Sequence, residues 1–256
     1  MIMDWNKNYL YHYTSFESAV KILSSGKLLF SDFRRLNDIN ESCGPAVIYS
    51  GFSDKEKSEF EKELSNYKQI SFTMDKPGRK GFDIPAMWGH YAHRGEGVCL
   101  VFDKEKLDED MNTEKSLYSK EVEYFPIQDP NELTYYKQYG VSFDEFINGF
   151  KDSLFFHKTK DWQYEQEYRI IAISDEIDWY DVSRFLIAVV LFNRSHDKFL
   201  NSVEYISLSR INPQLAFYRY TPGLGGVGNL FDCEGNKIWP PSIIMDFNRA
   251  RNAKEE

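Results

Sequence analysis

The feature that most constrains the fold is an unbroken apolar run at residues 185–192 (FLIAVVLF). A run of this length, rich in aliphatic and β-branched side chains, is typical of a strand buried on both faces. Residues 97–103 (GVCLVFD) predict a second buried strand. Because strands of this kind need other elements packed above and below them, the chain must form a sheet with covered faces.

Shorter patterns predict the elements around these strands. Residues 14–17 (TSFE) and 142–145 (SFDE) have the form of capping boxes, which predict the starts of two helices. Helices and strands do not alternate regularly, so we expect one α+β domain over residues 1–245 and not a doubly wound sheet. We expect the charged tail, residues 246–256, to be disordered. The remaining segments with strand character are 9–13, 27–30, 69–74, 117–125, 168–173, 204–208 and 215–220.

Composition limits the classes of protein. With 42% hydrophobic and 16% aromatic residues, the chain of 256 residues can bury a sizeable core. Its net charge of −9 argues against a general nucleic-acid coat or a membrane-surface binder, but allows an enzyme that meets nucleic acid through a local patch. Three separated cysteines without a CxxC pair predict reduced thiols. No apolar segment is long enough for a signal peptide or a membrane span, so we expect a cytoplasmic protein.

Residues 158–169 (KTKDWQYEQEYR) hold two carboxylates one residue apart, Glu165 and Glu167, directly before an apolar run. In an extended chain, residues i and i+2 point to the same face. Two like charges there repel each other unless a cation or a function uses them. The pair therefore marks either an exposed strand start, with Arg169 neutralising one Glu, or a functional site.

Familiar catalytic motifs are absent from the sequence: it contains no G-x-S-x-G, P-loop, HExxH or kinase signature. The glycine-rich residues 223–228 are not followed by an amphipathic helix, so we interpret them as a flexible loop. The residue types fit N-glycosidic cleavage of NAD better. A His can bind sugar hydroxyls, an aromatic ring can stack on a heterocycle, and a carboxylate can stabilise an oxocarbenium-like transition state.

Several motifs together resemble a widespread bacterial family that carries only a domain-of-unknown-function label. The likeness covers roughly residues 8–210, and it implies no activity by itself. Family members occur in bacterial and phage-defence settings. The motifs are HYT (12–14), LNDxxE (36–41), MWxHYA (87–92), GxCLxFD (97–103) and KxxxWxxExEYR (158–169).

The opening strand–HYT–helix–Gly–strand is also similar to ADP-ribosyltransferases, especially the DarT-like toxins and the RNA 2′-phosphotransferases. This resemblance implies a split, mostly antiparallel β core flanked by helices, with NAD as a substrate. It implies that Glu167 is the catalytic acid and that Glu165 orients the acceptor. The NAD-binding residues that it implies are His12, Thr14, Ser71, Tyr91 and, less directly, Trp88.

The resulting hypothesis is an NAD-dependent ADP-ribosyltransferase-like protein that modifies DNA, RNA or protein. It would be a toxin or phage-defence effector with an antitoxin or defence-system partner, and it would need no membrane. The alternative is a non-catalytic sensor or interaction domain on the same fold, binding a nucleotide or a phage component, with Trp162 and Arg169 in a structural network around the two Glu residues. A third hypothesis is a metal-dependent nuclease using Asp38, Glu41, Glu165 and Glu167; otherwise we expect no metal.

Overall fold

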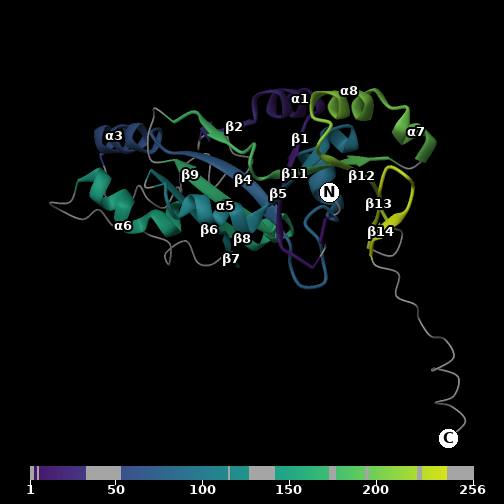
Figure 1. The fold of residues 1–256 in the computed structure, drawn as a ribbon. Coiled ribbons are helices and arrows are strands. Elements are labelled where there is room, and N and C mark those ends of the chain that lie inside the picture. Colours follow the sequence, from purple (N-terminus) through teal and green to yellow (C-terminus); the bar gives the residue numbers. More distant parts are fainter. Residues whose placement is uncertain are drawn as a thin grey trace, which may run out of the picture.

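The structure is a computed structural model that describes residues 3–4, 6–32, 53–114, 116–126, 142–172, 177–193, 196–223 and 227–240. One large, mostly antiparallel sheet runs through the molecule, with helices against its faces (Figure 1). This arrangement confirms the predicted α+β class. Residues 36–41, with Asp38 and Glu41, and the tail 246–256 lie outside the described part of the chain.

The main sheet has the strand order β14-β13-β12-β11-β5-β1-β4-β9-β6, with β3 beside β4. Neighbouring strands are antiparallel except β11 and β12, which are parallel because two short helices connect them. Two small ribbons, β10–β2 and β7–β8, lie outside this sheet. The strands are β1 Tyr9–Thr14, β2 Lys27–Leu29, β3 Ser31–Asp32, β4 Lys68–Met74, β5 Val98–Asp103, β6 Leu117–Glu121, β7 Glu123–Phe125, β8 His157–Thr159, β9 Glu167–Ala172, β10 Trp179–Asp181, β11 Leu186–Phe192, β12 Ala216–Thr221, β13 Asn229–Phe231 and β14 Lys237–Trp239.

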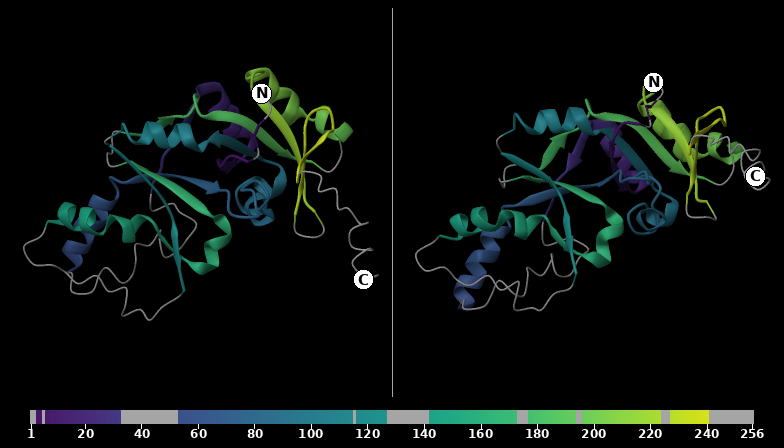
Figure 2. Two further views of the ribbon diagram at one scale, coloured as in Figure 1. Left: turned by 60° about the horizontal axis from the view of Figure 1, so that its bottom comes forward. Right: turned by 90° about the horizontal axis from the view of Figure 1, so that it is seen from below.

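Helices cover the sheet in separate groups, and α3 and α6 lie side by side at one end (Figure 2). Two 3-10 helices, η2 (His93–Gly95) and η4 (Lys160–Glu165), connect other elements. No helix among the described residues combines the length and apolar character needed to cross a membrane. The α-helices are α1 Phe16–Ser25, α3 Asp54–Leu64, α4 Pro85–His90, α5 Lys104–Met111, α6 Phe143–Phe155, α7 His196–Leu200 and α8 Val203–Ile211.

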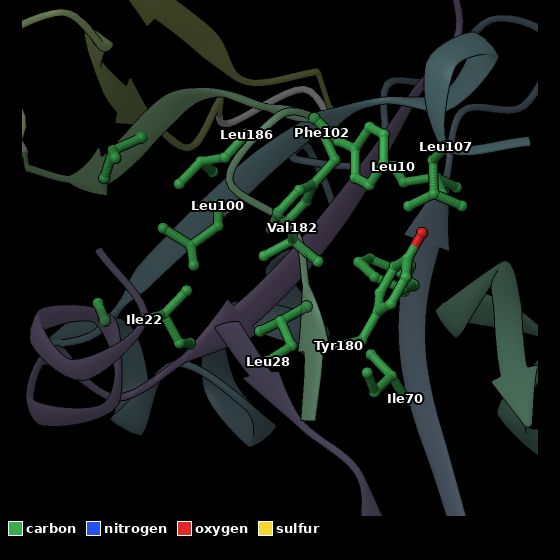
Figure 3. Packing of buried hydrophobic residues seen from close by; sticks show 14 of the residues in the cluster. Leu10, Ile22, Leu28, Ile70, Leu100, Phe102, Leu107, Tyr180, Val182 and Leu186 are labelled. Atoms are coloured by element: carbon green, nitrogen blue, oxygen red, sulfur yellow. The ribbon is translucent and has the colours of Figure 1, made fainter. Parts of the chain in front are cut away.

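One face of the sheet carries a continuous apolar core. Side chains of β1, β4, β5, β9 and β11 pack there against α1, α5, α7 and α8. Leu10, Leu100 and Phe102 are fully buried, and Figure 3 shows them with Leu28 and Leu107 from neighbouring elements. Packing on this side of the sheet therefore holds the strands together.

The other face is divided between two apolar clusters. One contains Tyr11 and packs β1, β5, β11 and β12 against α4. The second contains Ile171 and packs the far part of β9 against α3 and α6. Polar side chains lie on this face between the two clusters. In the ladder, Tyr11 of the first cluster pairs with Thr73, which pairs with Glu167, and Ile171 of the second cluster pairs with Gln69.

The sheet splits between β1 and β4. Strand β1 pairs with β5 along its whole length, yet it pairs with β4 only at Leu10–Met74 and Tyr11–Thr73. Strand β4 remains paired with β9 from Thr73 to Lys68. The two strands therefore separate beyond Tyr11, and their facing edges leave the hydrogen-bonded ladder.

Two local predictions were wrong. The first helix is capped by Ser15 and not by Thr14, because Thr14 still pairs with Val98 in the sheet; the Ser15 hydroxyl accepts from the Ser18 amide at 3.2 Å. Residues 204–208 lie in helix α8 and not in a strand. The Ser202 hydroxyl accepts from the Tyr205 amide at 3.2 Å and caps that helix. The capping box at Ser142 is confirmed.

Candidate functional site

A cavity of about 210 Å³ lies at the split in the sheet. Its wall includes residues 11–13 of β1 and 69–73 of β4, so consecutive residues of both separated strands contribute to it. Leu29 and Ser31 close one side, and Lys158 lies with the two carboxylates of the E-x-E motif on another. The cavity at the split thus has both apolar and charged side chains in its wall.

Five of the residues predicted from sequence line this cavity, and they come from distant parts of the chain. Neighbouring strands β1, β4 and β9 each supply one, a fourth follows α4, and a fifth ends η4. Their convergence depends on strand order and register, which bring segments more than 150 residues apart together. The five are His12, Ser71, Tyr91, Glu165 and Glu167.

His12 occupies the point where the strands separate. Its Nδ1 lies 3.0 Å from the carbonyl oxygen of Ser71. Because a carbonyl only accepts, Nδ1 carries the hydrogen, and Nε2 is the acceptor of the neutral ring. Burial lowers the pKa of His12, although the Ser71 carbonyl opposes this shift. At neutral pH the ring therefore offers an acceptor, not a positive charge.

Ser71 connects two parts of the cavity wall. Its hydroxyl accepts from Nε2 of Gln69 at 3.0 Å. Its own proton is then available to Glu167, and this hydrogen bond helps to lower the pKa of the Glu167 carboxyl. Since Ser71 lies opposite Arg169 in the ladder, both residues act on Glu167 from the same face of the sheet.

Glu167 is held by a bidentate ion pair. Nε of Arg169 donates to Oε1 at 2.6 Å, and Nη2 donates to Oε2 at 2.8 Å. Arg169 is fully buried, and its Nη1 donates to the Phe155 carbonyl at 2.7 Å. Burial by itself would raise the pKa of Glu167, but the charge and hydrogen bonds of Arg169 outweigh it and lower the pKa to about 2. Glu167 is thus an ionised carboxylate in a fixed position.

Glu165 has a different environment. The Tyr91 hydroxyl donates a short hydrogen bond to Oε1, and Nζ of Lys158 donates to Oε2 at 2.6 Å. Burial raises the pKa of Glu165, and Glu167 adds to this, while Lys158 and Tyr91 oppose it. Glu165 therefore exchanges a proton more readily near neutral pH than Glu167 does.

A backbone turn places the two carboxylates. Glu165 ends η4, Gln166 adopts a left-handed conformation with φ 48°, and β9 begins at Glu167. The expectation of one extended strand with both Glu residues on one face was therefore wrong, and neither residue is exposed. Their side chains still converge, because Nζ of Lys158 contacts Oε2 of Glu165 and, at 3.4 Å, Oε2 of Glu167.

Two predicted ligand-binding residues lie elsewhere. Trp88 is 2% exposed and does not line the cavity. Its Nε1 donates to the Phe82 carbonyl at 2.8 Å, and its ring stacks on Tyr220 with centroids 5.4 Å apart, so it is a core residue. Thr14 ends β1 beyond the cavity lining. Tyr91 lines the cavity, but its hydroxyl is bonded to Glu165, which ties the ring to the carboxylate pair.

Lys158 and Gln69 were not identified from sequence as site residues. Lys158 is 8% exposed and stands over the Trp162 ring, with Nζ 4.8 Å from its centroid. The signal that could have identified it is the KxxxWxxExEYR motif, which begins at this lysine. Gln69 had no comparable signal in the sequence. It lines the cavity and donates to the Ser71 hydroxyl because of its position on β4.

The nuclease hypothesis stays a prediction, because Asp38 and Glu41 lie outside the described residues. Among the described residues, no group of three or more His, Cys, Asp or Glu side chains is arranged to hold a metal ion. Glu165 and Glu167 are bound to Lys158 and Arg169.

The fold and site define an α+β protein with a cavity at a split in its sheet, lined in part by a charge-balanced cluster of buried side chains. A family model matches residues 87–170, and the family is described as a protein of unknown function (DUF2971). The matched range contains the MWxHYA and WxxExEYR motifs, so the resemblance to a family of unknown function is confirmed there. No curated protein and no solved structure matches the chain.

Proposed function

We propose that the chain is an NAD-dependent ADP-ribosyltransferase-like protein that modifies a macromolecule. The observation that carries this proposal is the convergence of five residues on one cavity. They are five of the seven residues that the sequence resemblance singled out for binding and cleaving NAD, namely His12, Ser71, Tyr91, Glu165 and Glu167; Thr14 and Trp88 do not line the cavity.

The size of the cavity favours one end of the dinucleotide. Pockets that enclose drug-sized ligands measure about 300–1,000 Å³, so a cavity of 210 Å³ suits the nicotinamide–ribose half and not the whole molecule. The unprotonated Nε2 of His12 would accept from a ribose hydroxyl. The buried carboxylates would stabilise the positive charge that develops on the ribose as the C1′–N bond breaks.

The proposed reaction transfers ADP-ribose from NAD to an acceptor. The C1′–N bond breaks, its electron pair goes to the nicotinamide nitrogen, and neutral nicotinamide leaves. A nucleophilic atom of the acceptor bonds to C1′ and loses its proton. Glu165 suits receipt of that proton because burial raises its pKa, whereas Glu167 stays ionised beside Arg169. This divides the work of the two carboxylates differently from the sequence resemblance, which put catalysis mainly on Glu167.

The test is release of nicotinamide from NAD by the purified protein, with Glu165→Gln as the variant. The substitution keeps the shape of the side chain and removes its charge, so we expect release to fall by about 100-fold or more. Glu96→Gln is the matched control, because the Glu96 side chain is 80% exposed and does not line the cavity. Failure of NAD and of nicotinamide to bind at millimolar concentration in calorimetry would rule the proposal out.

A second candidate function is a non-catalytic nucleotide-binding domain on the same fold. The bidentate Glu167–Arg169 pair favours it, because such a pair also serves as a purely structural network. Under this alternative, NAD or a nucleotide binds to the wild-type protein, no nicotinamide is released, and Glu165→Gln changes affinity without changing any chemistry.

A further inference from the structure

Lys158 is the centre of the charged cluster in the cavity wall. Its Nζ lies 2.6 Å from Oε2 of Glu165 and 3.4 Å from Oε2 of Glu167. Its side chain is 5% exposed, and the carboxylates that it contacts are 4% and 6% exposed. It therefore contacts both carboxylates of the E-x-E pair.

The cluster balances its charge within a small space. Lys158 and Arg169 supply two cations, and Glu165 and Glu167 supply two anions. The aromatic face of Trp162 supports the ammonium group, with Nζ 4.8 Å from the ring centroid. Arg169 donates to both oxygens of Glu167, and Lys158 donates to Glu165.

The other titratable groups around Glu165 and Lys158 that the structure describes include one further cation, Arg169, which is bound to Glu167. His12 is neutral because burial lowers its pKa, and the remaining groups are tyrosine hydroxyls or the other members of the cluster. They come from the end of α4, from β7, from η4, from β9 and from β1: Tyr91, Tyr124, Tyr164, Glu167, Arg169 and His12.

We propose that Lys158 is the positioning residue of this site, holding Glu165 ionised and directed into the cavity beside Glu167. It acts through the carboxylates and does not touch the reacting atoms. Removing its ammonium group leaves two buried carboxylates with one cation, and the less strongly paired of the two, Glu165, then takes up a proton. This inference rests on the proposed function for its activity readout, but not for its stability readout.

The experiment compares Lys158→Met, Lys158→Arg, Glu165→Gln and the double variant Lys158→Met/Glu165→Gln. We expect Lys158→Met to lower nicotinamide release by up to about 100-fold at neutral pH and to move the acid limb of the pH profile upward. Lys158→Arg keeps the charge and should keep the position of that limb. A lysine with only a structural role would change the melting temperature and leave the limb in place.

The stability readout requires no substrate. We expect Lys158→Met to lower Tm by roughly 6–12 °C at pH 8, because it leaves a buried charge without its partner. In the Lys158→Met variant the pKa of Glu165 would rise further above its ordinary value, because the ammonium group that lowers it is gone. A carboxyl whose pKa is raised on folding loses stability as the pH increases through that window, so the Tm deficit should be smaller at pH 5 than at pH 8.

The double variant Lys158→Met/Glu165→Gln tests whether the loss of stability in Lys158→Met comes from the charge on Glu165. It removes charge from both partners, so it should recover more than half of the Tm lost in Lys158→Met and abolish the pH dependence of the deficit. The control is the pair Lys68–Asp178, whose atoms lie 2.7 Å apart, against 2.6 Å for Lys158–Glu165, but whose carboxylate is 61% exposed. The same double-mutant cycle there should show little coupling. Absence of coupling at Lys158–Glu165 and of any pH shift would overturn the inference. Absence of nicotinamide release in the wild-type protein would instead overturn the proposed function.

Discussion

Two buried carboxylates on the same side of the sheet, Glu167 and Asp83, are satisfied in opposite ways. Glu167 is 5% exposed and binds the Arg169 guanidinium through both oxygens. Asp83 is 2% exposed and accepts from the Tyr220 hydroxyl at 2.8 Å and from the Gly228 amide at 2.9 Å. One carboxylate depends mainly on a charge, and the other on neutral donors.

The pKa values follow from this difference. Burial raises the pKa of Glu167, but Arg169, Lys158 and Ser71 together outweigh it and lower the pKa to about 2. Burial raises the pKa of Asp83, because the hydrogen bonds from Gly228 and Tyr220 only partly oppose it. Gly228 is required for this contact, since a Cβ there would lie 2.6 Å from Oδ1 of Asp83.

Their surroundings also differ. Glu167 lines the cavity at the split in the sheet, whereas Asp83 packs among Tyr220 and its neighbours away from that cavity. A buried carboxylate alone is therefore a poor indicator of function. The combination of an opening, compensating cations and further polar groups on the same wall is what distinguishes the site around Glu167.

The largest effect is expected for Glu167→Ala. It leaves Arg169, which is fully buried, without its counter-ion, so the free energy of unfolding should fall by about 3–5 kcal/mol. Urea denaturation measures the loss. A decrease of less than about 1 kcal/mol would show that the bidentate Glu167–Arg169 pair contributes little to stability.

The second-largest effect is expected from acid, which should lower the free energy of unfolding by protonating Glu167. Its pKa is lowered from 4.5 to about 2 on folding, which corresponds to roughly 3 kcal/mol. A lowered carboxyl pKa stabilises the fold above the unfolded value, so this contribution should be present above pH 4.5 and be lost as the pH falls toward 2. Thermal melts across that range measure it, with Glu167→Gln as the variant in which this part of the pH dependence should be missing.

Asp83→Ala should have a smaller effect. It leaves the Tyr220 hydroxyl and the Gly228 amide without their acceptor, and a cost of about 1–3 kcal/mol is typical for such groups. Nicotinamide release by the folded fraction should be unchanged. A selective loss of release would show that Asp83 belongs to the functional site and would remove the contrast with Glu167.

The smallest effect on stability is expected for Tyr91→Phe. The change removes one donor to Glu165 while Lys158 remains bound, so the loss should be about 1 kcal/mol in a denaturant titration. Without that donor the pKa of Glu165 should rise further, because the Tyr91 hydrogen bond lowers it. Under the proposed function, the acid limb of nicotinamide release would then move to higher pH; an unchanged limb would separate Tyr91 from the chemistry.

Local patterns in the sequence were sufficient for several elements. The buried strands β5 and β11 and the Ser142 capping box follow from side chains close together along the chain. Where two local signals competed, the prediction was less secure. Residues 204–208 alternate like a strand. They form a helix because Ser202 caps it and Leu208 is buried in the continuous apolar core on one face of the sheet.

What the sequence by itself determined was the α+β class and the types of residue in the site. The tertiary structure alone decided their arrangement, because contacts such as His12 with the Ser71 carbonyl and Tyr91 with Glu165 join residues far apart in the chain. Strand order and the register between β1 and β4 open the cavity, and no local propensity encodes that register. The same long-range packing bonds Glu167 to Arg169 and brings Lys158 between the two carboxylates, so the charge state of the site is a property of the fold.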